Sequence, residues 1–217
     1  MRARPALFTR ATVITWSCIQ AVTAICSALV TVITDGHHAR YALGALTLGM
    51  LASCLFTCFR TPLGQNGADQ MQLIVLIGLL CYFLGPDSLS RSAGVAFIGV
   101  QYVIAMATNG LTKLSSGTWR SGEAMVLIFR TRTYGNALAH GLMSRHPYVA
   151  RGACWSVIAF ETAVPLTVVV PHPGIAVLAC LGFHVGIALV MGLNSFVWSF
   201  GAAAFALVPL GGFVHSA

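Results

Sequence analysis

Long apolar runs limit most strictly how this chain can fold. A helix that crosses a bilayer needs about 20 mostly apolar residues, and the sequence offers seven segments of that kind. They are Ala11–Ile33, Ala42–Phe59, Gln70–Gly85, Ala93–Leu114, Ala153–Val170, Ile175–Leu193 and Phe196–Val214. Because the third is short and only two polar residues separate the last two, six or eight crossings also fit the pattern. The runs predict an all-α, polytopic transmembrane helix bundle.

The composition excludes most soluble classes. Of 217 residues, 57% are hydrophobic and only 8% are charged, whereas soluble domains have about a quarter charged residues. The formal net charge of +7 does not indicate nucleic acid, because the cations stand singly between apolar runs and not together on one polar surface. The expected partner is a lipid bilayer with anionic head groups, and residues 1–217 are expected to form a single domain.

The distribution of basic residues predicts an orientation. With seven crossings and a cytoplasmic N-terminus, only Arg40 and Arg91 would lie outside the cell. Cytoplasmic loops carry an excess of Lys and Arg, and the inner segments would hold ten of the twelve. These are Arg2, Arg4, Arg10, Arg60, Lys113, Arg120, Arg130, Arg132, Arg145 and Arg151. The sequence therefore predicts a protein of the cell membrane with its N-terminus in the cytoplasm.

One long polar stretch interrupts the apolar runs, from Ser115 to Arg151. It contains the apolar patch Ala124–Phe129, which is too short to span a bilayer. A short amphipathic helix of this kind lies in the membrane interface or re-enters from one side. We therefore expect an interfacial or re-entrant helix near residues 122–135.

Ionisable residues inside apolar runs are costly and usually functional. Glu161 lies ten residues before Pro171, and His184 lies ten residues after Gly174. At 1.5 Å per residue, both would lie about 15 Å below the same turn. An acid and an imidazole at one depth can share a proton, bind a polar head group or hold a metal. The alternative is a structural hydrogen bond between two helices; no histidine spacing resembles a zinc motif.

Lys113 is the single lysine of the chain, at the end of the fourth run. A desolvated lysine can act as a base, whereas a lysine at a helix end can also extend its amine to the head groups. Asp69 begins the third run and should lie at the same membrane face, where it could pair with Lys113. Asn109 is a neutral polar neighbour in the fourth run.

One block of this sequence resembles the signature of a known family. It reads Tyr102-x7-Gly110-Leu-Thr-Lys113-Leu-x4-Trp119-x2-Gly122, and it is similar to the HTTM (horizontally transferred transmembrane) domain. Further stretches similar to the family's pattern are Asn66–Gln70, Glu161-x3-Pro165-Leu166 and Phe183-His184-x8-Leu193-x2-Phe196. The family includes the vitamin K-dependent γ-carboxylases and small bacterial proteins that mature the sporulation-delaying toxin.

The resemblance implies roles for particular residues. In the carboxylases the lysine of this block deprotonates vitamin K hydroquinone, so Lys113 would be the base here. Glu161 and His184 would be the other catalytic residues, and no metal ligand is implied. The residues implied to bind substrate are Asp69, Tyr102, Asn109 and Trp119. The implied cofactor is a quinone such as a vitamin K-type hydroquinone, which the residues alone do not identify.

Three classes of function follow. The first is a membrane enzyme of the γ-carboxylase or epoxidase type that acts on a quinone-like or peptide substrate. The alternative is a non-catalytic membrane partner in maturation or export of a secreted peptide, together with a small soluble companion protein. A channel or transporter ranks last, because it would predict an inverted repeat and none is visible.

Two features of the carboxylases differ from this sequence. The carboxylases carry a large lumenal region that grips the substrate peptide, and nothing here resembles it, so carboxylation of glutamate is not expected. Their reaction faces the lumen, whereas the charge distribution places Lys113 at the cytoplasmic end of its helix. Either the helix count before Lys113 differs by one crossing, or the small family members differ in sidedness.

Overall fold

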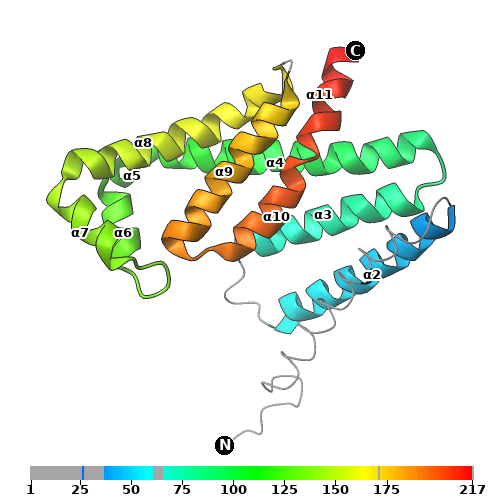
Figure 1. Ribbon diagram of the computed structural model, residues 1–217, viewed down its shortest axis with the longest axis horizontal. Helices are drawn as coiled ribbons and strands as arrows, with labels where there is room; N and C mark the ends of the chain where they lie inside the picture. The colour runs from blue at the N-terminus through cyan, green and yellow to red at the C-terminus, as the bar shows by residue number, and fades with distance from the viewer. Residues whose placement is uncertain (1–25, 27–36, 61–65, 171, 217) are drawn as a thin grey trace, which may run out of the picture. The chain divides into compact units, whose positions relative to one another are not determined.

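The computed structural model describes residues 26, 37–60, 66–170 and 172–216. In these ranges the regular elements are all helices, which confirms the all-α class (Figure 1). Five stretches are long and apolar enough to cross a membrane, and such a set is compatible with a multi-pass membrane protein. They are His38–Phe59, Gly67–Leu84, Ser88–Ser115, Pro173–Met191 and Asn194–Val214.

The predicted runs in the first half of the chain correspond to helices α2 (His37–Arg60), α3 (Gly67–Leu84) and α4 (Ser88–Ser115). Each helix begins a few residues before the apolar run, because polar residues form its first turn. Apart from Cys26, the first predicted run, Ala11–Ile33, lies outside the described residues. The count of seven crossings therefore stays a prediction.

The fifth predicted run, Ala153–Val170, is only partly α-helical. Helix α8 (Pro147–Ala163) is followed by a 3₁₀ helix, η2 (Val164–Val168). Pro165 lies in η2 and has no N–H to continue the α-helical hydrogen bonds, which accounts for the change at this point. The α-helical part is thus shorter than the other long helices.

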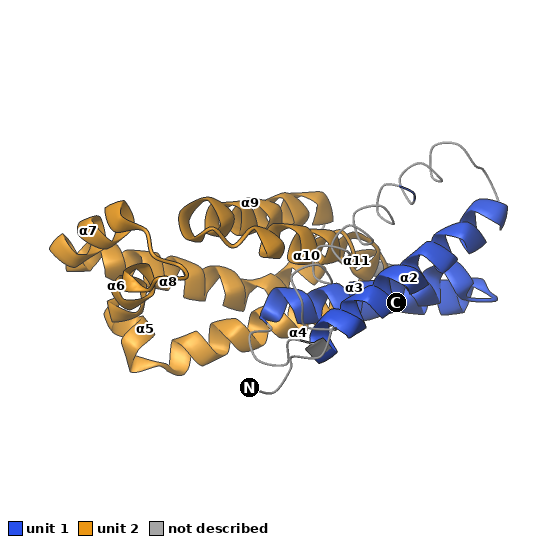
Figure 2. Ribbon diagram, turned by 90° about the horizontal axis from the view of Figure 1, so that it is seen from below, with its two compact units in different colours: residues 1–98 blue, residues 99–217 orange. Residues whose placement is uncertain are grey.

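The chain divides into two compact units, residues 1–98 and 99–217 (Figure 2). In the first unit α2 packs against α3. A Cβ added to Gly78 would lie 2.7 Å from the carbonyl oxygen of Gly94, so α3 and the start of α4 approach closely. The prediction that residues 1–217 form a single domain stays a prediction.

Polar side chains cap the N-termini of two helices in the first unit. The Asn66 side chain accepts hydrogen bonds from the N–H groups of the first turn of α3, and the Asp69 carboxylate accepts from the Asn66 N–H at 2.8 Å. This reciprocal arrangement is a capping box. Before α4, the Asp87 carboxylate accepts from the Ser90 N–H at 2.7 Å. The hydrogen bonds from Ser90 lower the pKa of Asp87.

In the second unit, α9 (Pro173–Met191) packs beside α10 (Asn194–Ala204), and α11 (Leu207–Ser216) follows. The predicted span Phe196–Val214 is therefore interrupted between α10 and α11. Pro209 explains the position of the break, because a proline ring clashes with the carbonyl four residues earlier, here that of Phe205. Helix α11 contacts both α9 and η2.

The polar stretch folds into three short helices, α5 (Gly117–Ser121), α6 (Glu123–Arg130) and α7 (Ala137–Arg145). The predicted interfacial helix near residues 122–135 corresponds to α6, and α7 was not predicted. Gly122 has φ +94°, and a Cβ there would lie 2.6 Å from the backbone nitrogen of Arg151. The backbone at the junction of α5 and α6 is thus in close contact with the backbone of α8.

Candidate functional site

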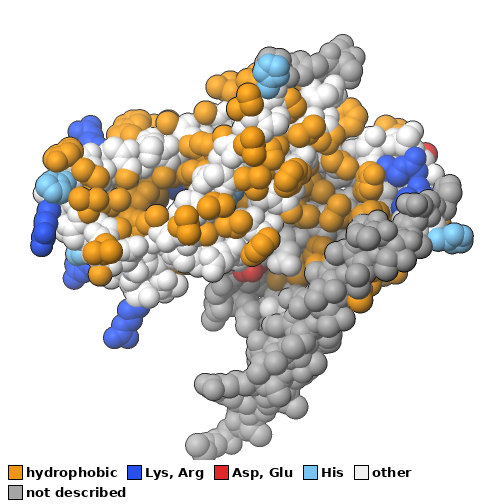
Figure 3. All heavy atoms as spheres, in the orientation of Figure 1, with side chains coloured by type: hydrophobic (Ala, Val, Ile, Leu, Met, Phe, Trp, Pro, Cys, Tyr) orange, Lys and Arg blue, Asp and Glu red, His pale blue; other side chains and the backbone are white. Residues whose placement is uncertain are grey.

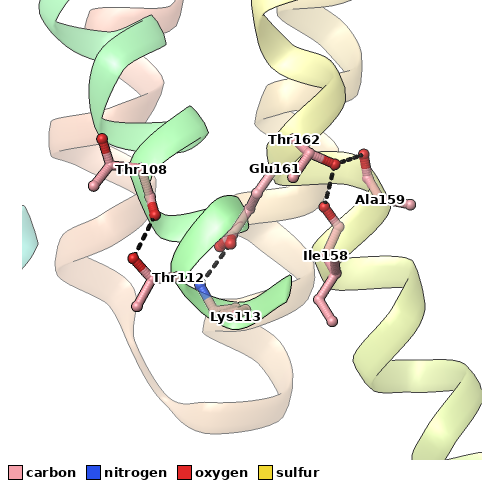
Figure 4. A network of polar contacts seen from close by, with 7 residues as sticks. All are labelled: Thr108, Thr112, Lys113, Ile158, Ala159, Glu161 and Thr162. Carbon is pink, nitrogen blue, oxygen red and sulfur yellow. Dashed lines mark hydrogen bonds and ion pairs between the residues drawn. The ribbon is translucent and has the colours of Figure 1, made fainter. Parts of the chain in front are cut away.

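The central feature of the second unit is an ion pair between α4 and α8. The Lys113 Nζ lies 2.5 Å from the Glu161 Oε2 (Figure 4). The two side chains are 19% and 8% exposed. The amine of the single lysine is thus held by a carboxylate and is only partly accessible.

A glycine allows the two helices to meet at this point. A Cβ on Gly110 would lie 2.7 Å from the Thr162 backbone nitrogen and 3.0 Å from the Glu161 carbonyl carbon. Gly110 is one turn before Lys113, so the close approach lies next to the ion pair. The Thr162 hydroxyl donates to the Ile158 carbonyl at 2.7 Å. It is therefore turned toward its own helix and not toward the pair (Figure 4).

We expect Gly110→Ala to destabilise the protein by about 1–3 kcal/mol, the usual cost of overpacking, and to lengthen the Lys113–Glu161 contact. Thermal or denaturant unfolding in detergent micelles would measure the first effect. Gly152→Ala is the matched control on α8, because a Cβ there meets nothing within 4 Å. Equal stability of the two variants would contradict a close contact at Gly110.

Trp119 covers the amine from another side. The Lys113 Nζ lies 5.2 Å from the centre of the Trp119 ring, within the range of a cation–π interaction. Trp119 belongs to α5 and packs against a buried cluster formed by α6 and Cys154 of α8. The lysine and tryptophan of the sequence block are thus brought together by the turn between α4 and α5.

His184 has a different partner from the one expected. Its Nε2 lies 3.5 Å from the Tyr102 hydroxyl, at the outer limit of a hydrogen bond. Tyr102 is 0% exposed and His184 is 2% exposed. The Phe200 ring centre lies 4.9 Å from that of His184 and 5.9 Å from that of Tyr102. The His184 Nδ1 is buried and has no hydrogen-bond partner among the described residues.

Glu161 and His184 do not bond to each other in the structure, although the residues that precede them are in contact. The residues before them, Phe160 and Phe183, stack with ring centres 4.2 Å apart and planes 18° apart. This stack is a direct side-chain contact between α8 and α9. Glu161 is bonded to Lys113 and His184 to Tyr102, so the described contacts form two polar pairs.

Two further predicted site residues are Asn109 and Asp69. The Asn109 side chain is exposed. Asp69 belongs to the first unit, where it is part of the cap of α3. Its pairing with Lys113 and the substrate-binding roles of both residues stay predictions.

Sequence reasoning missed the packing that supports the two pairs. It did not identify Gly110 as a close approach or the aromatic rings around His184. One signal was present: Glu161 and His184 each directly follow a phenylalanine, as Phe160-Glu161 and Phe183-His184.

Comparison with known proteins gives no further guide. No family model, no curated protein and no solved structure matches this chain. The resemblance to the HTTM family thus depends on the residues quoted above.

Proposed function

We propose that this chain is a multi-pass membrane protein of the HTTM type, with Lys113 as a base that acts on a quinone-like or peptide substrate. The observation that carries the proposal is the 2.5 Å pair between the single lysine and Glu161. The pair lies in an apolar helical protein where isolated charges would be costly. The five long apolar helices support the bilayer setting.

The neighbours of Lys113 suit proton uptake. In the ion pair Lys113 is an ammonium ion, so it can act as a base only after its proton has moved along the hydrogen bond to the Glu161 carboxylate. The neutral amine then takes a proton from the substrate and becomes an ammonium ion again. Glu161 stabilises that ion through the hydrogen bond, and the Trp119 face stabilises it through its π electrons. A general base must lie within hydrogen-bond reach of the proton it removes, and the 19% exposure of Lys113 leaves a route for this contact.

We assign the Tyr102–His184 pair to binding or proton relay. Tyr102 and Lys113 lie on nearly the same face of α4, about 16 Å apart along its axis at 1.5 Å per residue. The rings of Phe183 and Phe200 lie next to His184, and Tyr102, His184 and Phe200 are all buried. This setting suits a proton relay inside the protein better than direct contact with a substrate.

Lys113→Arg is the sharpest test of this function. Arginine can keep the charge pair with Glu161 but stays protonated, so it cannot serve as a base. We expect the folded variant to co-purify with the unreacted form of the ligand, and Lys113→Ala to lose that ligand selectively. Mass spectrometry of lipids and quinones extracted from each protein would measure this, with Arg91→Gln as the control.

Two outcomes would contradict the proposal. One is a ligand set that is unchanged in folded Lys113→Arg and Lys113→Ala. The other is a short secreted peptide and a small soluble protein that remain bound in both variants. That second result would favour the non-catalytic partner in peptide maturation.

A further inference from the structure

The outward surface of α6 and α7 combines leucines with arginines. Leu138 is 88% exposed, Leu142 is 51% exposed and Leu127 is 46% exposed. Leu138, Leu142 and Arg145 follow one another at helical spacing, so they share one face of α7. On α6, Leu127 and Arg130 are related in the same way. We call these five residues, with Arg132 of the connecting turn, the arginine cap.

The arginine cap is strongly basic. Arg130, Arg132 and Arg145 are all exposed, and within the described ranges none of them forms an ion pair. Glu123 is the single acidic residue between Ser115 and Arg151. The positive charge of this surface is therefore not neutralised by the part of the chain that the structure describes (Figure 3).

The cap lies at the ends of membrane-length helices. The Asn136 amide, which precedes α7, donates to the Val190 carbonyl in the last turn of α9 at 3.2 Å. The other face of α6 is buried against Cys154 of α8. Helix α5 connects this region to the end of α4. A surface fixed to the end of a spanning helix lies at the depth of the lipid head groups.

We propose that the arginine cap binds the surface of an anionic lipid leaflet. Arg130, Arg132 and Arg145 would contact lipid phosphates, while the leucines would insert between the head groups. Helices of eight and nine residues cannot span a bilayer, but helices with mixed cationic and apolar faces lie in its interface. A soluble acidic partner would meet the arginines but would not account for a leucine as exposed as Leu138. This inference does not depend on the function proposed for Lys113.

Lipid retention by the purified full chain tests the inference. The protein would be equilibrated with equimolar phosphatidylglycerol and phosphatidylcholine, and native mass spectrometry would count the lipids retained. We expect the wild type to retain more phosphatidylglycerol than phosphatidylcholine. In Arg130→Gln/Arg145→Gln the ratio of retained phosphatidylglycerol to phosphatidylcholine should fall about tenfold. Arg40→Gln/Arg91→Gln removes the same amount of charge outside the cap, so this variant should keep the preference for phosphatidylglycerol. Leu138→Ser/Leu142→Ser should lower retention of both lipids.

Salt gives a second readout that needs no variant. Raising the salt concentration should lower the wild-type preference, because it screens exposed charges. A wild type without preference for phosphatidylglycerol would overturn the inference and favour an acidic protein as the partner. A preference that survives either high salt or loss of Arg130 and Arg145 would overturn it as well.

Discussion

Glu161→Leu should lower the free energy of unfolding by about 3 kcal/mol, because it leaves the Lys113 amine without its carboxylate in an apolar setting. Breaking one partner of a buried ion pair costs about 3–5 kcal/mol. The lower end applies here, because Lys113 is 19% exposed and can turn partly toward the polar surface. Denaturant unfolding in micelles would measure the change.

A double variant separates loss of the pair from loss of packing. Lys113→Met/Glu161→Leu replaces both charges by apolar side chains, and such replacements are often neutral or stabilising. We therefore expect it to be more stable than Glu161→Leu alone. Glu123→Leu is the matched control, because Glu123 is exposed and its replacement should change stability by less than about 0.5 kcal/mol. Equal effects of Glu161→Leu and Glu123→Leu would contradict the pair.

Phe200→Ala should also cost about 3 kcal/mol. Phe200 is 3% exposed and contacts the rings of Tyr102, His184 and Phe196, with the Phe196 ring centre at 5.3 Å. Its removal leaves a cavity beside the imidazole. Unfolding in micelles measures the stability, and the histidine NMR signals should include one that shifts.

Phe205→Ala is the control for Phe200→Ala. It makes the same change in the same predicted span, but Phe205 is 60% exposed and its removal opens no buried cavity. We expect this variant to lose less than about 1 kcal/mol. If Phe200→Ala and Phe205→Ala lower the free energy of unfolding equally, the Tyr102–His184–Phe200 cluster is not a packed core.

The sequence predicts the class of fold because the hydropathy of a spanning helix is summed over a window of about 20 residues. One or two polar residues in such a window therefore do not change the result. It does not predict where α2 and α4 begin, since polar first turns carry no apolar signal. The changes at η2 and after α10 follow from Pro165 and Pro209. A count of apolar residues treats each proline as one more position in the run.

The sequence singles out the individual polar residues of the two pairs but not their pairing. Lys113, Glu161 and His184 each stand out because a charge or polar group in an apolar run is costly. Their pairing does not, because depth in the bilayer does not determine which way a helix is rotated. The close approach at Gly110 brings α4 to Glu161 and so gives the carboxylate to Lys113. That contact joins residues 48 positions apart in sequence.

The single lysine allows one measurement to test the Lys113–Glu161 pair directly. Protein labelled with ¹⁵N-lysine and ¹³C-glutamate has one Nζ signal and two side-chain carboxyl signals, from Glu123 and Glu161. Solid-state NMR of the protein in bilayers should show strong dipolar coupling from the Nζ to one carboxyl carbon, within about 4 Å. The coupling should persist in Glu123→Gln and vanish in Glu161→Gln. An Nζ without coupling to either carboxyl group, or coupled to Glu123, would contradict the paired base.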